Sequence, residues 1–293
     1  MKARNTFWSA SVVGLAAGVG LTSGANATPY AFAGDQISNL TITYADQSSI
    51  TPSTATTTIS DEAQFGGYGI SSFQTGGTVG SASTISQAYS GPGPSPSVSY
   101  TPEGAGTFSG ARSDAAFAAG SLSTGSGIGF NNVAEAYGAG LGNSSGTNSA
   151  GITFTVTGTG EALDVSFNDL IQLIASTLAV PGETAAASIQ NSFSLTPEGA
   201  STPLFIFSPT ALNQQVSSTQ GVPPSDDVGP TTVPASFATP VLMSGVMYTL
   251  TLTSMASETI QAGSTPAPLP EPASFAVLIP GLVAAGLCRR QRS

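Results

Sequence analysis

The central part of this chain lacks the residues that most enzymes use for chemistry. Its 293 residues include no histidine, one lysine (Lys2), one tryptophan (Trp8) and one cysteine (Cys288). The stretch from Thr28 to Leu269 therefore contains none of these four residue types. This excludes Ser-His pairs, imidazole-bound zinc, lysine Schiff bases and thiol nucleophiles from the stretch. It also excludes disulfides, so a core and a hydrogen-bonded sheet must stabilise the fold.

Positive charge is scarce as well. From Thr28 to Leu269 a single base, Arg112, stands against fifteen acids, which gives this stretch a formal charge of −14. Such a surface cannot neutralise phosphates, so we expect no nucleic-acid partner and no binding to anionic lipid surfaces. The other five basic residues lie near the two ends of the chain, at Lys2, Arg4, Arg289, Arg290 and Arg292.

The chemistry that remains is that of carboxylates, or of Thr28 if removal of a signal peptide makes it an N-terminal nucleophile. A glycan hydrolase needs two acids that face each other, whereas sequence neighbours on a strand point to opposite faces of the sheet. The same acids could contribute to a calcium site, but none has the spacing of an EF-hand loop. We therefore expect no enzyme activity, no metal site and no cofactor. The acids considered are the pairs Asp61/Glu62, Glu161/Asp164 and Asp226/Asp227, and the group Asp164/Asn168/Asp169.

The first 27 residues have the three parts of a secretory signal peptide. Lys2 and Arg4 form a positive start, residues 10–21 are apolar and small, and Ala25 and Ala27 form an A-x-A cleavage site. An uncleaved membrane anchor is the alternative, but the apolar stretch is short. We expect signal peptidase to remove residues 1–27.

Short segments that alternate apolar and hydroxyl residues recur through the rest of the chain. This alternation is typical of strands that bury one face, and Gly, Pro, Ser and Asn clusters separate the segments. With 40% hydrophobic residues the chain can also bury a core. We predict an all-β fold, an antiparallel β-sandwich of jelly-roll type, over residues 28–262. The clearest segments are residues 40–44, 152–156, 163–167, 193–195, 204–207 and 246–252.

Other segments are less clear. Residues 168–178 could form a helix capped by Asn168 or extend the preceding strand, and the alanine-rich residues 113–119 could also be helical. Two stretches rich in Gly and Ser, residues 66–106 and 120–151, have the composition of long loops or loosely specified edge strands.

The C-terminal end has a distinct layout. A Pro-rich linker, residues 263–269, precedes Pro270, Glu271 and Pro272. Residues 273–288 then form an uncharged apolar run that would span about 24 Å as a helix, which is short for a membrane span. The following arginines, Arg289, Arg290 and Arg292, would hold the end of the chain in the cytoplasm as a stop-transfer signal.

This tail, residues 270–293, resembles the PEP-CTERM sorting signal of exopolysaccharide-producing Gram-negative bacteria. Its Pro-Glu-Pro motif, hydrophobic stretch and arginine-rich end match the three parts of that signal. The same tail has also been labelled an ice-binding protein C-terminal motif, but it is no evidence for ice binding. The resemblance implies that an integral-membrane exosortase recognises the tail and cleaves near the motif.

We therefore expect an exported protein. It would cross the inner membrane, insert there transiently through a short C-terminal hydrophobic helix, and end at the cell surface or in the biofilm matrix. A structural or adhesive role is the first interpretation. The alternative is a carbohydrate-binding module or a carboxylate-dependent glycan hydrolase that acts on exopolysaccharide.

Overall fold

A computed structural model describes residues 28–76, 84–92, 100–103, 105–116, 122, 128–157, 159–177, 182–219 and 226–263 of the chain. These residues form two antiparallel sheets packed face to face, so the predicted all-β sandwich is confirmed. The predicted signal peptide, nearly all of the linker and the whole sorting tail lie outside the described residues.

Sheet A has six strands. They follow the order β12 (Asp226–Ala238), β8 (Leu163–Ser176), β1 (Tyr30–Tyr44), β6 (Ile128–Tyr137), β5 (Phe108–Ala116) and β4 (Thr84–Ser90).

Sheet B has seven strands. Six of them follow the order β10 (Phe205–Phe207), β9 (Thr184–Pro197), β13 (Met247–Gln261), β7 (Leu141–Thr155), β2 (Thr54–Phe65) and β3 (Tyr68–Gly76). The seventh, β11 (Gln214–Thr219), also pairs with β9, and the 3₁₀ turn η1 (Thr210–Leu212) precedes it.

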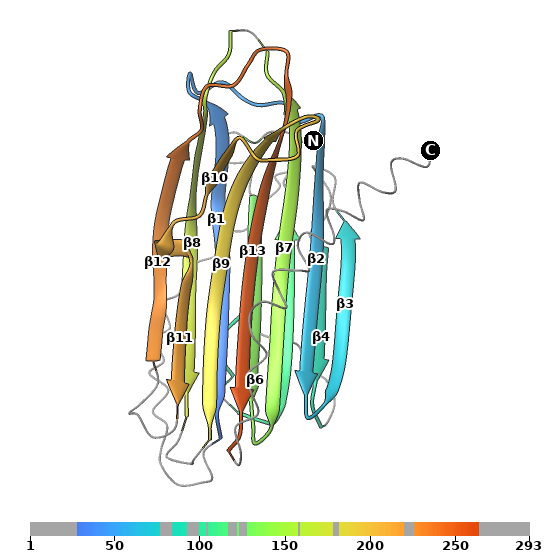
Figure 1. Cartoon of the computed structure of the whole chain (residues 1–293), viewed down its shortest axis with the longest axis vertical. Coiled ribbons are helices and arrows are strands. Elements are labelled where there is room, and N and C mark those ends of the chain that lie inside the picture. The colour runs from blue at the N-terminus through green and yellow to red at the C-terminus, as the bar shows by residue number, and fades with distance from the viewer. Residues whose placement is uncertain are drawn as a thin grey trace, which may run out of the picture.

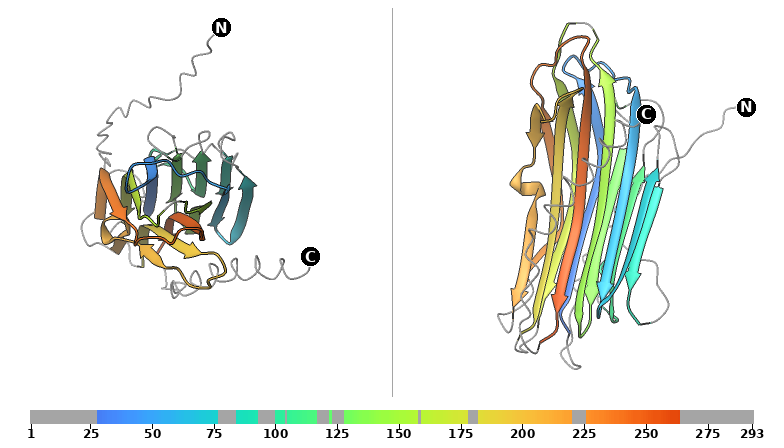
Figure 2. Two further views of the ribbon diagram at one scale, coloured as in Figure 1. Left: turned by 90° about the horizontal axis from the view of Figure 1, so that it is seen from above. Right: turned by 45° about the vertical axis from the view of Figure 1, so that its right-hand side comes forward.

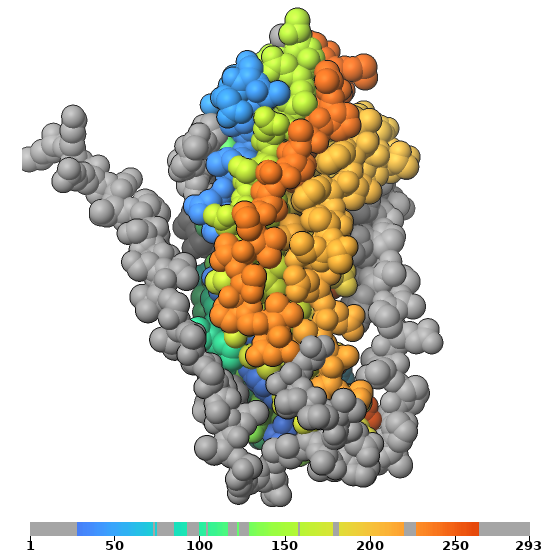
Figure 3. Space-filling model, turned by 90° about the vertical axis from the view of Figure 1, so that its left-hand side faces the viewer, coloured from blue at the N-terminus to red at the C-terminus, as the bar shows by residue number. Residues whose placement is uncertain are grey.

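The strands run along the long axis of the molecule, and the two sheets form two layers (Figures 1 and 2). One side of the sandwich ends at β12 together with β10 and β11, and the other ends at β3 and β4 (Figure 1). Figure 3 shows the first of these sides, where the orange β12 lies beside the gold segment that contains β10, η1 and β11. At this edge β12 carries Pro234 and a register shift between Val228 and Thr231.

Strict alternation builds the core. In β13 every second residue from Tyr248 to Ile260 is buried, and β7 and β9 alternate in the same way. An aromatic cluster lies within this core: the ring of Phe193 lies 4.9 Å from that of Phe167 and 5.2 Å from that of Phe237. These contacts join β9 of sheet B to β8 and β12 of sheet A, so they hold the two layers together.

Of the two alternatives for residues 168–178, the extension of the preceding strand is confirmed, because residues 168–176 continue β8. The helix predicted for residues 113–119 is wrong where the structure describes it, because residues 113–116 belong to β5. In β8 buried and solvent-facing residues alternate along the whole strand, and Phe167, Asp169 and Ile171 occupy successive buried positions. The alternation was not evident in the sequence because Asp169, a carboxylate, occupies a buried position where an apolar residue is expected. In the part of the chain that the structure describes, no helix is long and apolar enough to cross a membrane.

The prediction of loops or edge strands for residues 120–151 was also wrong where the structure describes them, because β6 and β7 are central strands. Small residues of β7 face the opposite sheet at close range. A Cβ on Gly142 would lie 3.4 Å from Ala136 Cβ of β6, and one on Gly146 would lie 2.8 Å from Ser113 Oγ of β5. Low complexity here reflects a lack of space between the sheets. Within residues 66–106, by contrast, β3 and β4 are edge strands, as that pattern allowed.

Truncation of Phe193 should measure how much the aromatic contact stabilises the sandwich. We expect Phe193→Ala to lower the free energy of unfolding by about 3–5 kcal/mol, because it leaves a cavity among buried rings. The control, Ile206→Ala, removes an apolar side chain that is 61% exposed on the nearby β10 and should cost less than about 1 kcal/mol. Urea unfolding of both variants checks this, and equal losses would contradict the packing described.

Candidate functional site

A layer of polar side chains lies between the two sheets. Strand register places Asp35 of β1 beside Asn132 of β6, and it places Ser254 of β13 between Asn148 of β7 and Asn191 of β9. Asp169 of β8 pairs with Ile37, one inward position along from Asp35. All six side chains are at most 1% exposed. Polar groups buried this deeply must satisfy one another.

The six side chains form one hydrogen-bonded network. Asn191 Nδ2 donates to Asp169 Oδ2 at 2.8 Å and to Asp35 Oδ1 at 3.3 Å. Ser254 Oγ donates to Asp35 Oδ2, and Asn132 Nδ2 donates to Ser254 Oγ. Asn148 Nδ2 donates to Asn132 Oδ1 at 2.9 Å. The network therefore crosses from one sheet to the other several times.

Asp35 and Asp169 form a buried acid pair that shares one donor, Asn191 Nδ2. Burial raises the pKa of both carboxyl groups, and the charge of Asp35 raises that of Asp169 further. Arg112 is the one basic residue among the described residues, and it pairs with Asp114 at 3.1 Å instead. Two carboxylates without a cation between them cannot both ionise in a dry interior, so the pair shares a proton.

Two further acids sit in the same interior. Ser113 Oγ donates to Asp61 Oδ1 at 2.6 Å, and burial raises the pKa of Asp61 to about 6. Ser144 Oγ donates to Glu258 Oε1 at 2.7 Å, and burial raises the pKa of Glu258 to about 8. Serine hydroxyls oppose both shifts without cancelling them.

A separate buried acid lies on the outer face of sheet A. Glu135 accepts a hydrogen bond from Tyr30 Oη at 2.8 Å and another from the backbone N–H of Glu103 at 2.7 Å. Burial, followed by the charge of Glu135, raises the pKa of the Tyr30 hydroxyl. This contact ties the segment around Glu103 to the sheet.

The acids considered in the sequence are not brought together. Asp61 is buried whereas Glu62 is exposed on the opposite face of β2, as expected for strand neighbours. Asp169 likewise points inward, whereas Asp164 and Asn168 lie on the other face of β8. Asp227 is exposed on β12. The described residues contain no cluster of three or more acidic, histidine or cysteine side chains that could hold a metal ion.

Sequence reasoning missed the residues that do converge: Asp35, Asn132, Asn148, Asn191 and Ser254. The available signal was a polar residue at an inward position of an alternating strand, as in residues 31–37, where Ala31, Ala33 and Ile37 are also buried. The predicted sorting residues Pro270, Glu271, Pro272, Arg289, Arg290 and Arg292 lie outside the described residues, as do the cleavage residues Ala25 and Ala27.

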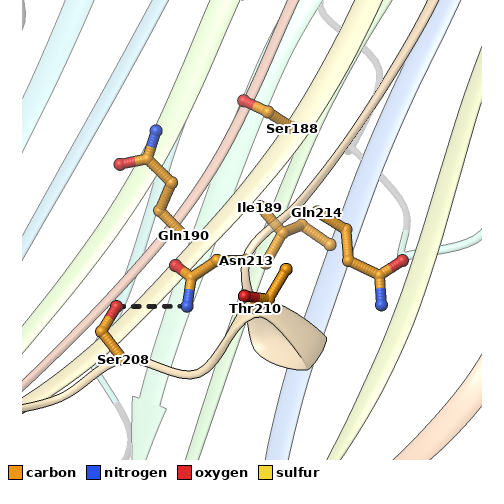
Figure 4. A pocket seen from close by; sticks show the side chains of 7 residues that line it. All are labelled: Ser188, Ile189, Gln190, Ser208, Thr210, Asn213 and Gln214. Carbon is orange, nitrogen blue, oxygen red and sulfur yellow. Dashed lines mark hydrogen bonds between the residues drawn. The ribbon is translucent and has the colours of Figure 1, made fainter.

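Two shallow depressions lie on the described surface. One, of about 320 Å³, lies beside β9 where the turn η1 crosses it (Figure 4). Asn213 Nδ2 donates there to Ser208 Oγ at 3.2 Å, and its Oδ1 accepts from the backbone N–H of Asn191 at 2.9 Å. The other, of about 530 Å³, contains Asn39, which has a φ of 54° at the bulge of β1. The side chains that line both depressions carry no acid and no base.

The outer face of sheet B is covered with hydroxyl groups. On β9, β13 and β7, Thr251 lies opposite Ser194, Thr253 lies between Ser192 and Ser149, and Thr249 shares a 3.1 Å hydrogen bond with Thr153. Neighbouring strands are about 4.8 Å apart, so these hydroxyls form regular rows. On β2, β7, β9 and β13 the one charged residue on this face is Glu62. The face is polar but almost uncharged.

The buried acids predict a protein that is more stable in acid than in base. Each pKa is higher in the folded chain than in the unfolded chain, so the folded state keeps protons that the unfolded state releases. The resulting stabilisation is complete below about pH 4 and is lost as the pH rises through about 6 for Asp61 and about 8 for Glu258.

Glu258→Gln tests this dependence, because glutamine can accept the same serine hydrogen bond but does not ionise. At pH 9 we expect it to raise the free energy of unfolding by at least ~1.4 kcal/mol, the equivalent of one pKa unit, with little effect at pH 4.5. Glu62→Gln, on the outer face, is the control. Chemical denaturation across this pH range provides the measurement, and the same pH profile for both variants would refute the assignment.

Comparison with family models, curated proteins and solved structures finds no match to this chain.

Proposed function

We propose that this chain is an exported protein that exosortase processes at its C-terminal tail and that acts at the cell surface or in the extracellular matrix. The observation that carries the proposal is the tail sequence, in which Pro270, Glu271 and Pro272 precede an apolar run and three arginines. A predicted signal peptide at the other end supports it, because a sorting tail of this kind functions only in a chain that enters the export pathway.

The body supports a structural or adhesive role. It is an elongated sandwich with no lysine, histidine or cysteine, and its central acids lie between the sheets. Both depressions are lined by uncharged side chains, which supply neither a general acid nor a general base. These features favour a rigid spacer or contact surface over a catalyst.

A carbohydrate-binding role is the second candidate. The rows of threonine and serine on sheet B could contact the hydroxyl groups of a polysaccharide, and the lack of charge on this face suits a neutral chain. Hydrolysis is less well supported, because Asp35 and Asp169 are 0% exposed and a polymer could not reach them. Binding through such hydroxyls would be weak per contact and would depend on many contacts.

Two sets of tail variants test the sorting proposal. Replacement of Pro270, Glu271 and Pro272 by Ala should leave membrane insertion intact but stop processing, because the extended recognition segment would join the following helix. Replacement of Arg289, Arg290 and Arg292 by Ser should instead weaken retention and orientation in the inner membrane. Cell fractionation with intact-mass analysis should show an uncut, membrane-bound species for the first set. Normal cleavage and export of that set would refute the proposal.

The binding candidate predicts a loss of affinity when charge is placed on the hydroxyl face. Thr251→Arg should abolish co-sedimentation of the protein with the producing cell's own exopolysaccharide, because the larger cation disrupts the row of hydroxyls. Asn168→Arg places the same side chain on the outer face of sheet A and should leave binding unchanged. If the two variants bind equally well, the hydroxyl face of sheet B is not the binding surface.

A further inference from the structure

One serine in the buried polar layer contacts both a carboxylate and a carboxamide. Ser254 Oγ donates a hydrogen bond to Asp35 Oδ2 and accepts one from Asn132 Nδ2. The serine comes from β13 of sheet B, whereas the other two residues come from neighbouring strands of sheet A. All three are 0% exposed. A nucleophile, a base and an acyl group therefore meet in a site from which water is excluded.

We propose that Ser254 and Asn132 react with each other to form an intramolecular ester bond that links β13 to β6 across the sandwich. This inference goes beyond the proposed function and does not depend on it. It concerns a reaction that the chain performs once on itself, with no external substrate.

Asp35 is placed to act as the general base. Its Oδ2 accepts the Ser254 hydroxyl proton, while its Oδ1 is held by Asn191 Nδ2 at 3.3 Å. Asp169 is a positioning residue, because it accepts a 2.8 Å hydrogen bond from Asn191 Nδ2, the same atom that holds Asp35. An acid pair with one proton offers an ionised oxygen to the serine and keeps the second carboxyl neutral. The arrangement follows the nucleophile, base and orienting group of other hydroxyl nucleophiles.

Asn148 is placed to stabilise the developing negative charge. Its Nδ2 donates to Asn132 Oδ1 at 2.9 Å, and the backbone carbonyls of Asn131 and Asp114 hold the same nitrogen at 3.0 and 3.1 Å. A fixed donor on the carbonyl oxygen of an amide is the arrangement that stabilises a tetrahedral intermediate. This hydrogen bond also fixes the orientation of the Asn132 amide, so that its nitrogen faces Ser254.

The reaction balances without a further reactant. Ser254 Oγ forms a bond to Asn132 Cγ as its proton passes to Asp35, and the C–N bond of the amide then breaks. Asp35 returns the proton to the departing nitrogen, so ammonia leaves and the carboxylate is regenerated. The products are one ester and one ammonia, with no change in oxidation state. Loss of ammonia from the site and exclusion of water would prevent the reverse reaction and hydrolysis.

Other buried serines lack this combination. Ser113 Oγ donates a hydrogen bond to Asp61, and Ser144 Oγ donates hydrogen bonds to Glu258 and to the backbone oxygen of Gly110. Among the described residues, neither hydroxyl forms a hydrogen bond with a side-chain amide, so neither has an acyl group to attack. The geometry thus selects Ser254 and Asn132.

Such a bond would have a physical benefit in this chain. The body has no cysteine, and the two residues are 122 positions apart in the sequence. A covalent link across a loop of this length removes much of the conformational freedom of the unfolded chain, as a disulfide does in other exported proteins.

Peptide mapping of the purified full-length chain tests the proposal. Cleavage after glutamate under denaturing conditions should release residues 104–135, which contain Asn132, and residues 199–258, which contain Ser254. We expect one species whose mass is the sum of the two peptides less one ammonia. Hydroxylamine should convert it into two peptides, because it cleaves esters but leaves amides intact. Recovery of both peptides unlinked, each at its sequence mass, would overturn the proposal.

Variants assign the roles. Ser254→Ala and Asp35→Asn should both abolish the linked species, the first by removal of the nucleophile and the second by removal of the base. Ser257→Ala is the matched control, because Ser257 lies on the same strand but forms a hydrogen bond with Ser188 on the outer face. In this variant the ester between Ser254 and Asn132 should form completely. A linked species that survives in Ser254→Ala would overturn the assignment. The peptide map of the unaltered chain decides the main question even if a variant fails to fold.

Discussion

The structure depends on one requirement: the acids buried between the two sheets must be stabilised by hydrogen bonds and protonation, without cations. Asp35, Asp61, Asp169 and Glu258 all lie in the interior, and the one described base, Arg112, pairs elsewhere. The sandwich solves this by surrounding each acid with serine hydroxyls or asparagine amides and by retaining protons. Because each partner comes from a different strand, the polar contacts specify one register and one arrangement of the two sheets, which apolar contacts alone would define less sharply.

This solution also accounts for the unusual composition. Gly142, Ser144 and Gly146 fill the first inward positions of β7, where the opposite sheet approaches closely, and serine and threonine occupy most of its outward positions, so that hydroxyls rather than ions solvate the surface. Although its sequence is low in complexity, β7 is therefore constrained on both its inward and its outward face. A substitution of Gly146 by a larger residue would push against Ser113 and disturb its hydrogen bond to Asp61.

The fold class was predictable from the sequence because period-two alternation is a local signal, and segments such as residues 152–156 and 246–252 show it clearly. The same rule failed at Asp169 and in β7, where inward positions are acidic or small and do not register as apolar. The polar layer could not be predicted, because its members come from six strands. Only the register within each sheet together with the packing of one sheet on the other shows that Ser254 meets Asp35, two residues that are 219 positions apart.

The edge strand β12 adds a constraint on how such molecules can assemble. A free edge normally offers a row of N–H and C=O groups to a neighbouring chain. Here Pro234 has no N–H to offer, and the bulge between Val228 and Thr231 interrupts the row. Sheet A therefore resists continuation into a neighbouring molecule along this side. Molecules of this protein at high local concentration could then pack densely without forming fibrils by strand pairing through the β12 edge. Contacts between neighbouring molecules on this side would instead involve the faces of the sheets and the loops.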